Sequence, residues 1–458
     1  MVRGRSLGQA IGVVALVCAT FGVSTASAQV DYEIMASLQF NFSNPGARSL
    51  AMAGALTGAG DDATGASTNP GGLTNITRPE VGVEFRGFGF ETPFVTSGRF
   101  NGTPTNIGID TVNGLTYGNT DNSTHSLSFV SAVVPKSRFA FAFYRTEVAN
   151  YEADIQTVGP FYDQETGTAC SPSRPDRCFR IFPVNGNLDL QISNFGGSAA
   201  VRLIDELSVG VGVSFYDFEM NSVNRRFGLT AFPQTNAGGF YGPPNYDSSN
   251  VIASEFISGE DSAFGINIGA SINPNDKFRI GASYRQGPKF DIAYHRENFA
   301  GTLIGDLHAS EFKVPDVIAL GVLVKPVDAL NVTVDFRRVQ YSQLISEMGL
   351  GFAVPGVTAD DYVLDDGNEF RAAGEYLFTN FSSPLSAIAI RGGVWNDPDH
   401  RIRYEGVFQP DSVLFQPGDS EMHYTFGGGI VFEKAQFDVG FDRSETVKTF
   451  SVSAVLRF

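Results

Sequence analysis

The last segment of the chain alternates strictly between apolar and polar side chains. Phe450, Val452, Ala454, Leu456 and Phe458 share one parity, and polar residues occupy most of the other. Because successive side chains of a β-strand point to opposite faces, this pattern predicts a strand between an apolar and an aqueous environment. About thirteen earlier segments alternate in the same way. The chain is therefore expected to be all-β.

The connections between these segments alternate in length. The predicted strands are 81–90, 124–134, 137–147, 186–203, 206–220, 262–273, 277–294, 312–325, 328–341, 368–378, 385–395, 421–432, 435–443 and 447–458. Short turns follow the even-numbered strands, as at Ile204-Asp205 and Glu433-Lys434, and most other connections are long. Outer-membrane barrels have short periplasmic turns, long external loops and an even number of strands. We therefore predict a 14-stranded antiparallel transmembrane β-barrel rather than a soluble sandwich.

The amino terminus has the features of a secretory signal. Arg3 and Arg5 precede an apolar stretch at 11–23, and Ala26-Ser27-Ala28 provides a cleavage pattern before Gln29. We expect residues 1–28 to be removed and the mature chain to reach the cell outer membrane. After Gln29 no stretch approaches the ~18 to 20 apolar residues of a spanning helix. A membrane-spanning mature chain would therefore cross as strands.

Composition argues against several other functions. The net charge of −17 disfavours a nucleic-acid partner, because phosphate contacts need clustered Lys and Arg. The five histidines are scattered without metal-ligand spacing, and no Gly-x-Ser-x-Gly motif occurs. We expect no enzyme activity, no cofactor and no metal site. Cys170 and Cys178 are expected to form a disulfide in an exported loop, the alternative being two free thiols.

Residues 29–80 differ in composition from the predicted barrel of residues 81–458. They are rich in Ala, Gly, Leu and Met, and the apolar run between Leu50 and Leu56 makes full solvation unfavourable. A fourteen-stranded barrel is wider than one whose own side chains fill its interior. We expect this segment to lie inside as a plug. The alternative is a disordered periplasmic tail.

Two stretches of this segment resemble a known family. NPGARSLAMAGA (44–55) and DDATGASTNPGGL (61–73) are similar to the N-terminal hatch of the FadL/TodX family of outer-membrane transporters of hydrophobic compounds. Asn69-Pro70-Gly71 stands where that family usually has Asn-Pro-Ala, and we expect it to form a tight turn that gates the hatch or remains static. The predicted hairpins at 265–292 and 314–336 resemble the same family.

The resemblance implies a monomeric barrel, plugged by its hatch, that takes up long-chain fatty acids or other hydrophobic small molecules by diffusion. External loops capture the ligand, a pocket beside the hatch receives it, and it leaves through the wall near a kinked strand. Outer-membrane lipid and lipopolysaccharide would surround the barrel. The third predicted strand has no Gly or Pro within 139–147 to mark such a kink, so sequence does not place the exit.

Candidate ligand contacts fall into three groups. One loop supplies external capture candidates, which alternatively pack the loops together: Phe227, Leu229, Phe232, Phe240 and Tyr241. The hatch supplies Leu50, Met52 and Leu56 as apolar ligand-facing candidates. Arg337 and Arg391 lie on the luminal parity, where they would meet a carboxylate head group or pair with neighbouring acids.

Two other functions remain open from the sequence. The hatch stretch also resembles PorV-like barrels, which serve as structural or protein-secretion components and would bind exported proteins. An open porin would conduct ions despite the hatch. We take transport of a hydrophobic compound as the leading hypothesis.

Overall fold

The computed structural model describes residues 44–120, 122–163, 178–229, 240–298, 308–348, 350 and 356–458. The predicted signal peptide, Cys170 and Phe232 lie outside the described residues. No helix within these described ranges is long and apolar enough to span a membrane.

Fourteen antiparallel strands form the closed wall of a barrel. In order around the ring they are β1 (Glu80–Phe90), β4 (Asn122–Lys136), β5 (Phe139–Thr157), β8 (Val184–Ile204), β9 (Leu207–Phe227), β10 (Val251–Asn275), β11 (Phe278–Arg285), β14 (Val317–Val327), β15 (Leu330–Val339), β17 (Gly367–Phe378), β18 (Leu385–Asp397), β20 (Glu421–Phe432), β21 (Ala435–Arg443) and β22 (Val447–Arg457). Pairing of β22 with β1 closes the ring. The predicted fold class is confirmed.

Two predicted strands are each interrupted near a proline. The segment predicted at 277–294 divides into β11 and β12 (Lys289–Asn298), and that at 312–325 into β13 (His308–Lys313) and β14. Pro288 and Pro315 lie at these breaks, where proline has no N–H for the ladder. Strands β12 and β13 pair with each other, and β12 also pairs with the first residues of β10.

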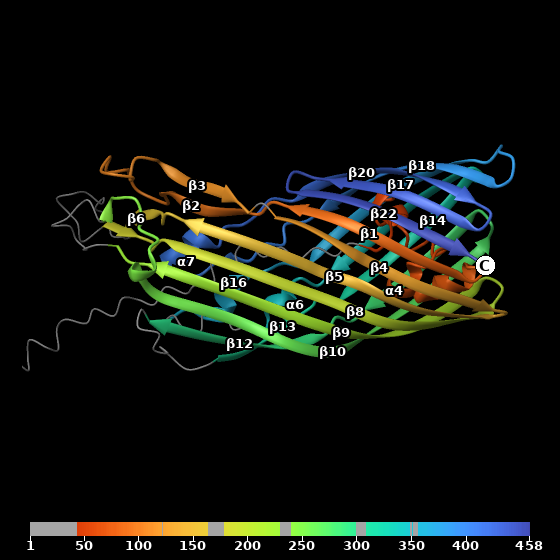
Figure 1. Ribbon diagram of the computed structural model, residues 1–458, viewed down its shortest axis with the longest axis horizontal. Coiled ribbons are helices and arrows are strands. Elements are labelled where there is room, and N and C mark those ends of the chain that lie inside the picture. Colours follow the sequence, from red (N-terminus) through yellow and green to blue (C-terminus); the bar gives the residue numbers. More distant parts are fainter. Residues whose placement is uncertain are drawn as a thin grey trace, which may run out of the picture.

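Further short elements belong to the connections between the wall strands. Figure 1 shows β2, β3 and β6 at the end of the barrel away from the carboxyl terminus, here called the loop end, and α6 and β16 nearer the middle. The short elements are β2 (Pro93–Arg99), β3 (Gly114–Asn119), β6 (Phe161–Asp163), β7 (Cys178–Arg180), β16 (Tyr362–Val363), β19 (Arg403–Tyr404), α6 (Ser342–Ile345), α7 (Gln409–Leu414), η3 (Ser248–Asn250) and η4 (Ala359–Asp361). Strands β3, β2, β6 and β7 form one small sheet, and β16 pairs with β19.

The apolar face of the wall changes sides along the barrel. On β9, Val211 and Phe215 are exposed on the outside near the short turns. Farther along the same strand, Glu219 occupies an outward position, while Phe218 and Met220 are buried on the inside. The wall therefore carries an outer apolar band in its turn-end half and an inner apolar lining in its loop-end half.

Candidate functional site

The described part of the predicted plug, residues 44–75, lies inside the barrel and is bonded to several sides of the wall, while residues 29–43 lie outside the described residues. Its elements are α3 (Ala47–Ala51), α4 (Gly65–Thr68) and η1 (Pro70–Asn75). The Gly46 amide donates to Glu84 on β1 at 2.7 Å, and the Thr57 amide donates to Asp335 on β15 at 2.8 Å. On β20, the Thr425 hydroxyl donates to the Ala51 carbonyl at 3.0 Å. These contacts place the hatch in the lumen, as the plug interpretation expects.

The Asn69-Pro70-Gly71 turn packs closely against β9 and β10. The Asn69 side chain is fully buried; its amide donates to the carbonyls of Thr57 at 2.9 Å and Ala270 at 3.2 Å. Its oxygen accepts from the Gly71 amide at 3.2 Å, which caps η1. A Cβ on Gly71 would lie 2.7 Å from the Ala270 Cα, so the approach of β10 requires glycine.

Charged side chains join the other side of the hatch to the wall. Arg48 contacts Asp61 at 2.7 Å and Asp62 at 3.0 Å within the hatch, and Glu375 of β17 at 3.1 Å. Glu375 in turn pairs with Arg391 at 2.6 Å. Because these groups are largely buried, removal of one partner would leave an uncompensated charge. The network therefore anchors the hatch strongly.

The two luminal arginines considered as head-group contacts are already engaged. Arg391 also pairs with Asp438 at 2.7 Å, and Arg337 donates to the side chain of Asn44 in the hatch. Arg391 therefore follows the alternative of pairing with neighbouring acids, whereas Arg337 bonds to an amide of the hatch.

A cavity of about 30 Å³ lies between part of the hatch and the wall. Leu50, Phe88 and Val447 line it together with Trp395, the chain's one tryptophan. A space of this size holds about one water, so a larger ligand would enter only if the hatch moved. Leu50 is thus the one predicted hatch contact that borders this cavity.

The other two hatch candidates have a different environment. Met52 and Leu56 pack with Leu323 and Ala373 of the wall in a separate apolar cluster. They contribute to the seating of the hatch.

Polar groups surround the Trp395 side of the cavity. Trp395 stacks on His423 at 3.8 Å between centroids, and the Arg371 guanidinium lies 3.9 Å from its ring. Asp442 accepts from Trp395 Nε1 at 3.2 Å and contacts His423 Nδ1 at 2.9 Å. These contacts fix the orientation of the Trp395 indole. This side of the cavity therefore combines an aromatic ring with polar groups.

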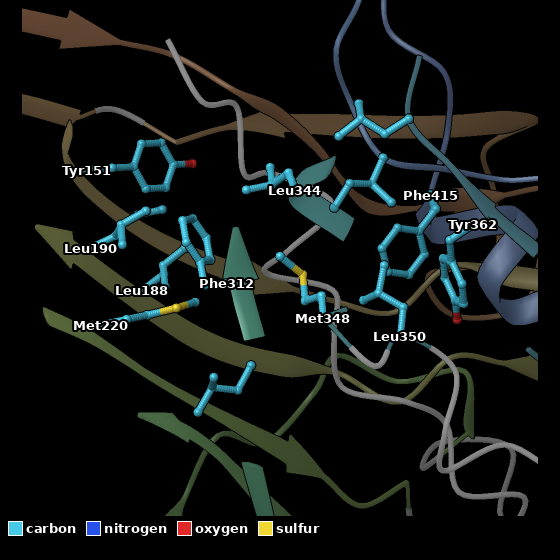
Figure 2. Packing of buried hydrophobic residues seen from close by; sticks show 14 of the residues in the cluster. Tyr151, Leu188, Leu190, Met220, Phe312, Leu344, Met348, Leu350, Tyr362 and Phe415 are labelled. Carbon is cyan, nitrogen blue, oxygen red and sulfur yellow. The ribbon is translucent and has the colours of Figure 1, made fainter. Parts of the chain in front are cut away.

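A larger cluster of buried apolar side chains, here called the chamber, packs inside the loop-end half of the barrel, and Figure 2 shows part of it. Its side chains come from inward positions on the wall strands, from β13 and β16, and from the connections that carry α6 and α7. Those labelled in Figure 2 are Tyr151, Leu188, Leu190, Met220, Phe312, Leu344, Met348, Leu350, Tyr362 and Phe415. The sequence interpretation did not single them out. Leu188, Leu190, Met220 and Phe312 lie within predicted strands, but their inward apolar parity was not noticed, whereas Tyr151 lies past the predicted end of its strand at 147.

The wall opens between β4 and β5. Their pairing runs from Lys136–Phe139 to Phe129–Thr146, and above it, within the described residues, β4 stays with β1 while β5 stays with β8. A β-bulge between Glu147 and Ala149 marks the divergence, and a pocket of about 60 Å³ lies there. Its lining residues are Arg86, Phe88, Thr124, Ser128, Glu147, Val148, Ala149 and Asn150.

This bulge explains why the sequence did not place an opening. A bulge inserts an extra residue, here Val148, and needs neither glycine nor proline. Phe88 borders both this pocket and the cavity beside the hatch. The two spaces therefore lie on either side of one aromatic ring.

The external capture candidates are mostly buried. Phe240 and Tyr241 pack with Phe161 and Cys178, and Leu229 packs partly against this group. Phe227 is also buried, with its ring 5.2 Å from that of Tyr246. They hold the loops together, the alternative left open by the sequence. A capture role for them, and for Phe232 outside the described residues, stays a prediction.

Cys178 is disulfide-bonded, while its predicted partner Cys170 lies outside the described residues. The Tyr241 hydroxyl lies 3.2 Å from the Cys178 sulfur. The disulfide therefore belongs to the packed loop cluster.

Comparison with known proteins identifies the architecture. Residues 183–376 match the family model described as outer membrane protein transport protein (OMPP1/FadL/TodX). The resemblance to the FadL/TodX family is confirmed. No curated protein matches the sequence.

Solved structures of low sequence identity share the fold. A Pseudomonas aeruginosa FadL homologue matches with a TM-score of 0.63 at 14% identity, covering 92% of this chain and 100% of that one. The Ralstonia pickettii toluene transporter TbuX matches at 0.51 and 16%, covering 91% and 99%. The P. putida toluene transporter TodX matches at 0.52 and 11%, with the same coverage.

Proposed function

We propose that this barrel, which resembles the FadL/TodX family over residues 183–376 and shares the fold of a FadL homologue, lies in the outer membrane and admits a hydrophobic small molecule by passive binding and diffusion. Long-chain fatty acids are the first substrate class, and aromatic hydrocarbons are the second because toluene transporters share the fold. The ligand enters the chamber, passes to the cavity beside the hatch and leaves through the wall opening.

The observation that carries this proposal is the position of Phe88, which contacts all three regions. It packs against the apolar cluster of the chamber and lines both the cavity beside the hatch and the pocket at the wall opening, whose other lining residues are mostly polar. Each buried methylene contributes ~0.8 kcal/mol, so a sixteen-carbon chain would gain on the order of 10 kcal/mol before entropy costs. That is sufficient for reversible binding, which a diffusive path requires.

Movement of the hatch is part of the proposal. The cavity has space for about one water, so ligand passage requires displacement of Leu50 and its neighbours. Ligand binding would supply the free energy by its preference for the displaced state. The Asn69 turn, held by three hydrogen bonds, is the expected pivot.

The decisive test removes the bulge. Deletion of Val148 restores regular alternation along β5 and is expected to narrow the opening, reducing uptake of a fluorescent long-chain fatty acid into proteoliposomes at least tenfold. Val148→Ala keeps the extra residue and serves as the matched control. Unchanged uptake by the deletion variant would reject the lateral route.

Ligand identity is tested separately by mass spectrometry of the gently purified protein. A retained fatty acid or aromatic hydrocarbon supports transport and names the class. Failure to bind any hydrophobic compound, together with capture of exported proteins, would favour the secretion-component alternative. Steady ion conductance in a planar bilayer would favour an open porin.

A further inference from the structure

A groove of about 480 Å³ lies on the outer surface of the wall, where β1 runs between β4 and β22. Gly87 and Gly89 form its floor, at outward positions that continue the exposed series Val81, Val83 and Phe85. Two glycines in succession on this face remove the side chains that would otherwise fill the space. The groove has the size of many ligand sites, which occupy roughly 300–1,000 Å³.

Aromatic side chains form one side of the groove. The Phe441 ring lies 4.8 Å from that of Phe426 and 5.0 Å from that of Phe450, and all three line the groove. They lie at the loop-end edge of the outer apolar band, and His125 lines the opposite side. An aromatic edge of this kind is typical of the boundary between acyl chains and head groups.

Two cations occupy the next outward positions on the same strands, two residues from Phe441 and from Phe450. Arg443 and Lys448 are cross-strand partners on β21 and β22, both exposed and both lining the groove. Like charges at opposed positions are destabilising. Lys448 pairs with Glu91 at 2.7 Å, whereas Arg443 has no carboxylate within 4.0 Å among the described residues. Asp442 also lines the groove, but Trp395 and His423 engage its carboxylate. Glu91 is therefore the one lining carboxylate left to balance the two cations, and the top of the groove is positively charged.

We propose that this groove binds a phosphorylated, acylated lipid of the outer leaflet, of the lipid A type. An acyl chain lies over Gly87 and Gly89 against the aromatic rings, and a phosphate bridges Arg443 and Lys448. A guanidinium binds phosphate through two parallel hydrogen bonds, and the anion relieves the repulsion between the cations. The site lies outside the lumen and does not depend on the compound that is transported.

The test is native mass spectrometry of the full barrel in detergent, titrated with lipid A and separately with phosphatidylcholine. The double variant Arg443→Gln with Lys448→Gln is expected to lose lipid A affinity at least tenfold. The matched control is Arg338→Gln with Lys289→Gln, which removes two other exposed cations away from the groove. The control is expected to bind as the unaltered chain does.

A second variant tests the apolar floor while keeping both cations. A Cβ on Gly87 would lie 2.7 Å from Nδ1 of His125, the end of a side chain that can turn away, so Gly87→Val is expected to fold. Heat-modified gel mobility checks the barrel in every variant. Weaker lipid A binding by Gly87→Val supports the acyl placement. Equal binding by all variants, or equal binding of phosphatidylcholine, overturns the proposal.

Discussion

At the scale of single residues, Gly71 shows how closely the hatch fits its wall. A methyl group there would meet backbone atoms of β10 at 2.7–2.8 Å, which cannot turn aside as a flexible side chain would. We expect Gly71→Ala to cost ~2 kcal/mol through overpacking and to loosen the hatch. Increased ion conductance in planar bilayers would report this loosening.

Gly65→Ala is the matched control for that prediction. The nearest atom to a Cβ on Gly65 is Leu73 Cδ2 at 3.9 Å, an ordinary contact, and alanine favours the helix that this residue begins. Its conductance should equal that of the unaltered chain. If Gly71→Ala also behaved as the unaltered chain does, the close approach of β10 would not matter for gating.

Glu375 is the central residue of the ionic contacts between hatch and wall. Replacement by Gln removes the charge that Arg48 and Arg391 share, with an expected cost of ~3 kcal/mol because both arginines remain buried. Faster protease cleavage within the hatch would detect it. Asp366→Asn at the exposed Arg338 pair should change stability by less than ~1 kcal/mol. Similar effects of the two substitutions would contradict the anchoring role.

The buried carboxyl group of Asp411 is expected to make the stability of the external loops depend on pH. Burial raises its pKa from 3.8 to about 6, although the Tyr362 hydroxyl, 2.5 Å away, and Arg226 favour the ionised form. A carboxyl with a raised pKa binds its proton more tightly in the folded state, so stability falls as pH rises from about 4 through about 6.

The corresponding variant is Asp411→Asn, which still accepts from Tyr362. It should stabilise α7 by ~2 kcal/mol at pH 7.5 and have little effect near pH 4. Hydrogen exchange of residues 409–414, corrected for the intrinsic effect of pH, measures this. A stabilisation equal at both pH values would show that ionisation is not the cause.

At the scale of elements, alternation predicted strands better than it predicted their ends. All fourteen wall strands were located, because each has an outward apolar series in its turn-end half. Strands β5, β9 and β10 extend several residues farther toward the loop end than expected. There the apolar residues move to the inner face, so an argument based on an outward lipid band had no reason to continue.

The candidate site was predictable in part for a related reason. The Asn69 turn was found because its residue types dictate local backbone geometry. The chamber depends on residues from distant strands, and the opening depends on a bulge that single-strand patterns do not indicate. Leu50 was assigned correctly to the hatch, but only the tertiary packing shows that it borders a cavity while Met52 does not.

At the scale of the whole molecule, the reversal of apolar faces defines where the bilayer surrounds the barrel. The outer band would lie in lipid, while the inner lining begins where acidic residues such as Glu219 face outward into water. The chamber therefore stands above the membrane. In the proposed route a ligand passes from this apolar region through the mostly polar opening to the acyl chains, and such passage by diffusion would require no energy source.

A series of arginine substitutions along β9 tests this placement. An arginine facing lipid costs ~2–4 kcal/mol at mid-bilayer and ~0–1 kcal/mol near an interface. Val211→Arg should therefore be the most destabilising, Phe215→Arg intermediate, and Glu219→Arg nearly neutral, when guanidinium unfolding is measured in liposomes. All three side chains point outward on one strand, so depth is the main variable. A cost at Glu219 equal to that at Val211 would mean that the bilayer extends over the chamber, and the lateral route would then open in the wrong place.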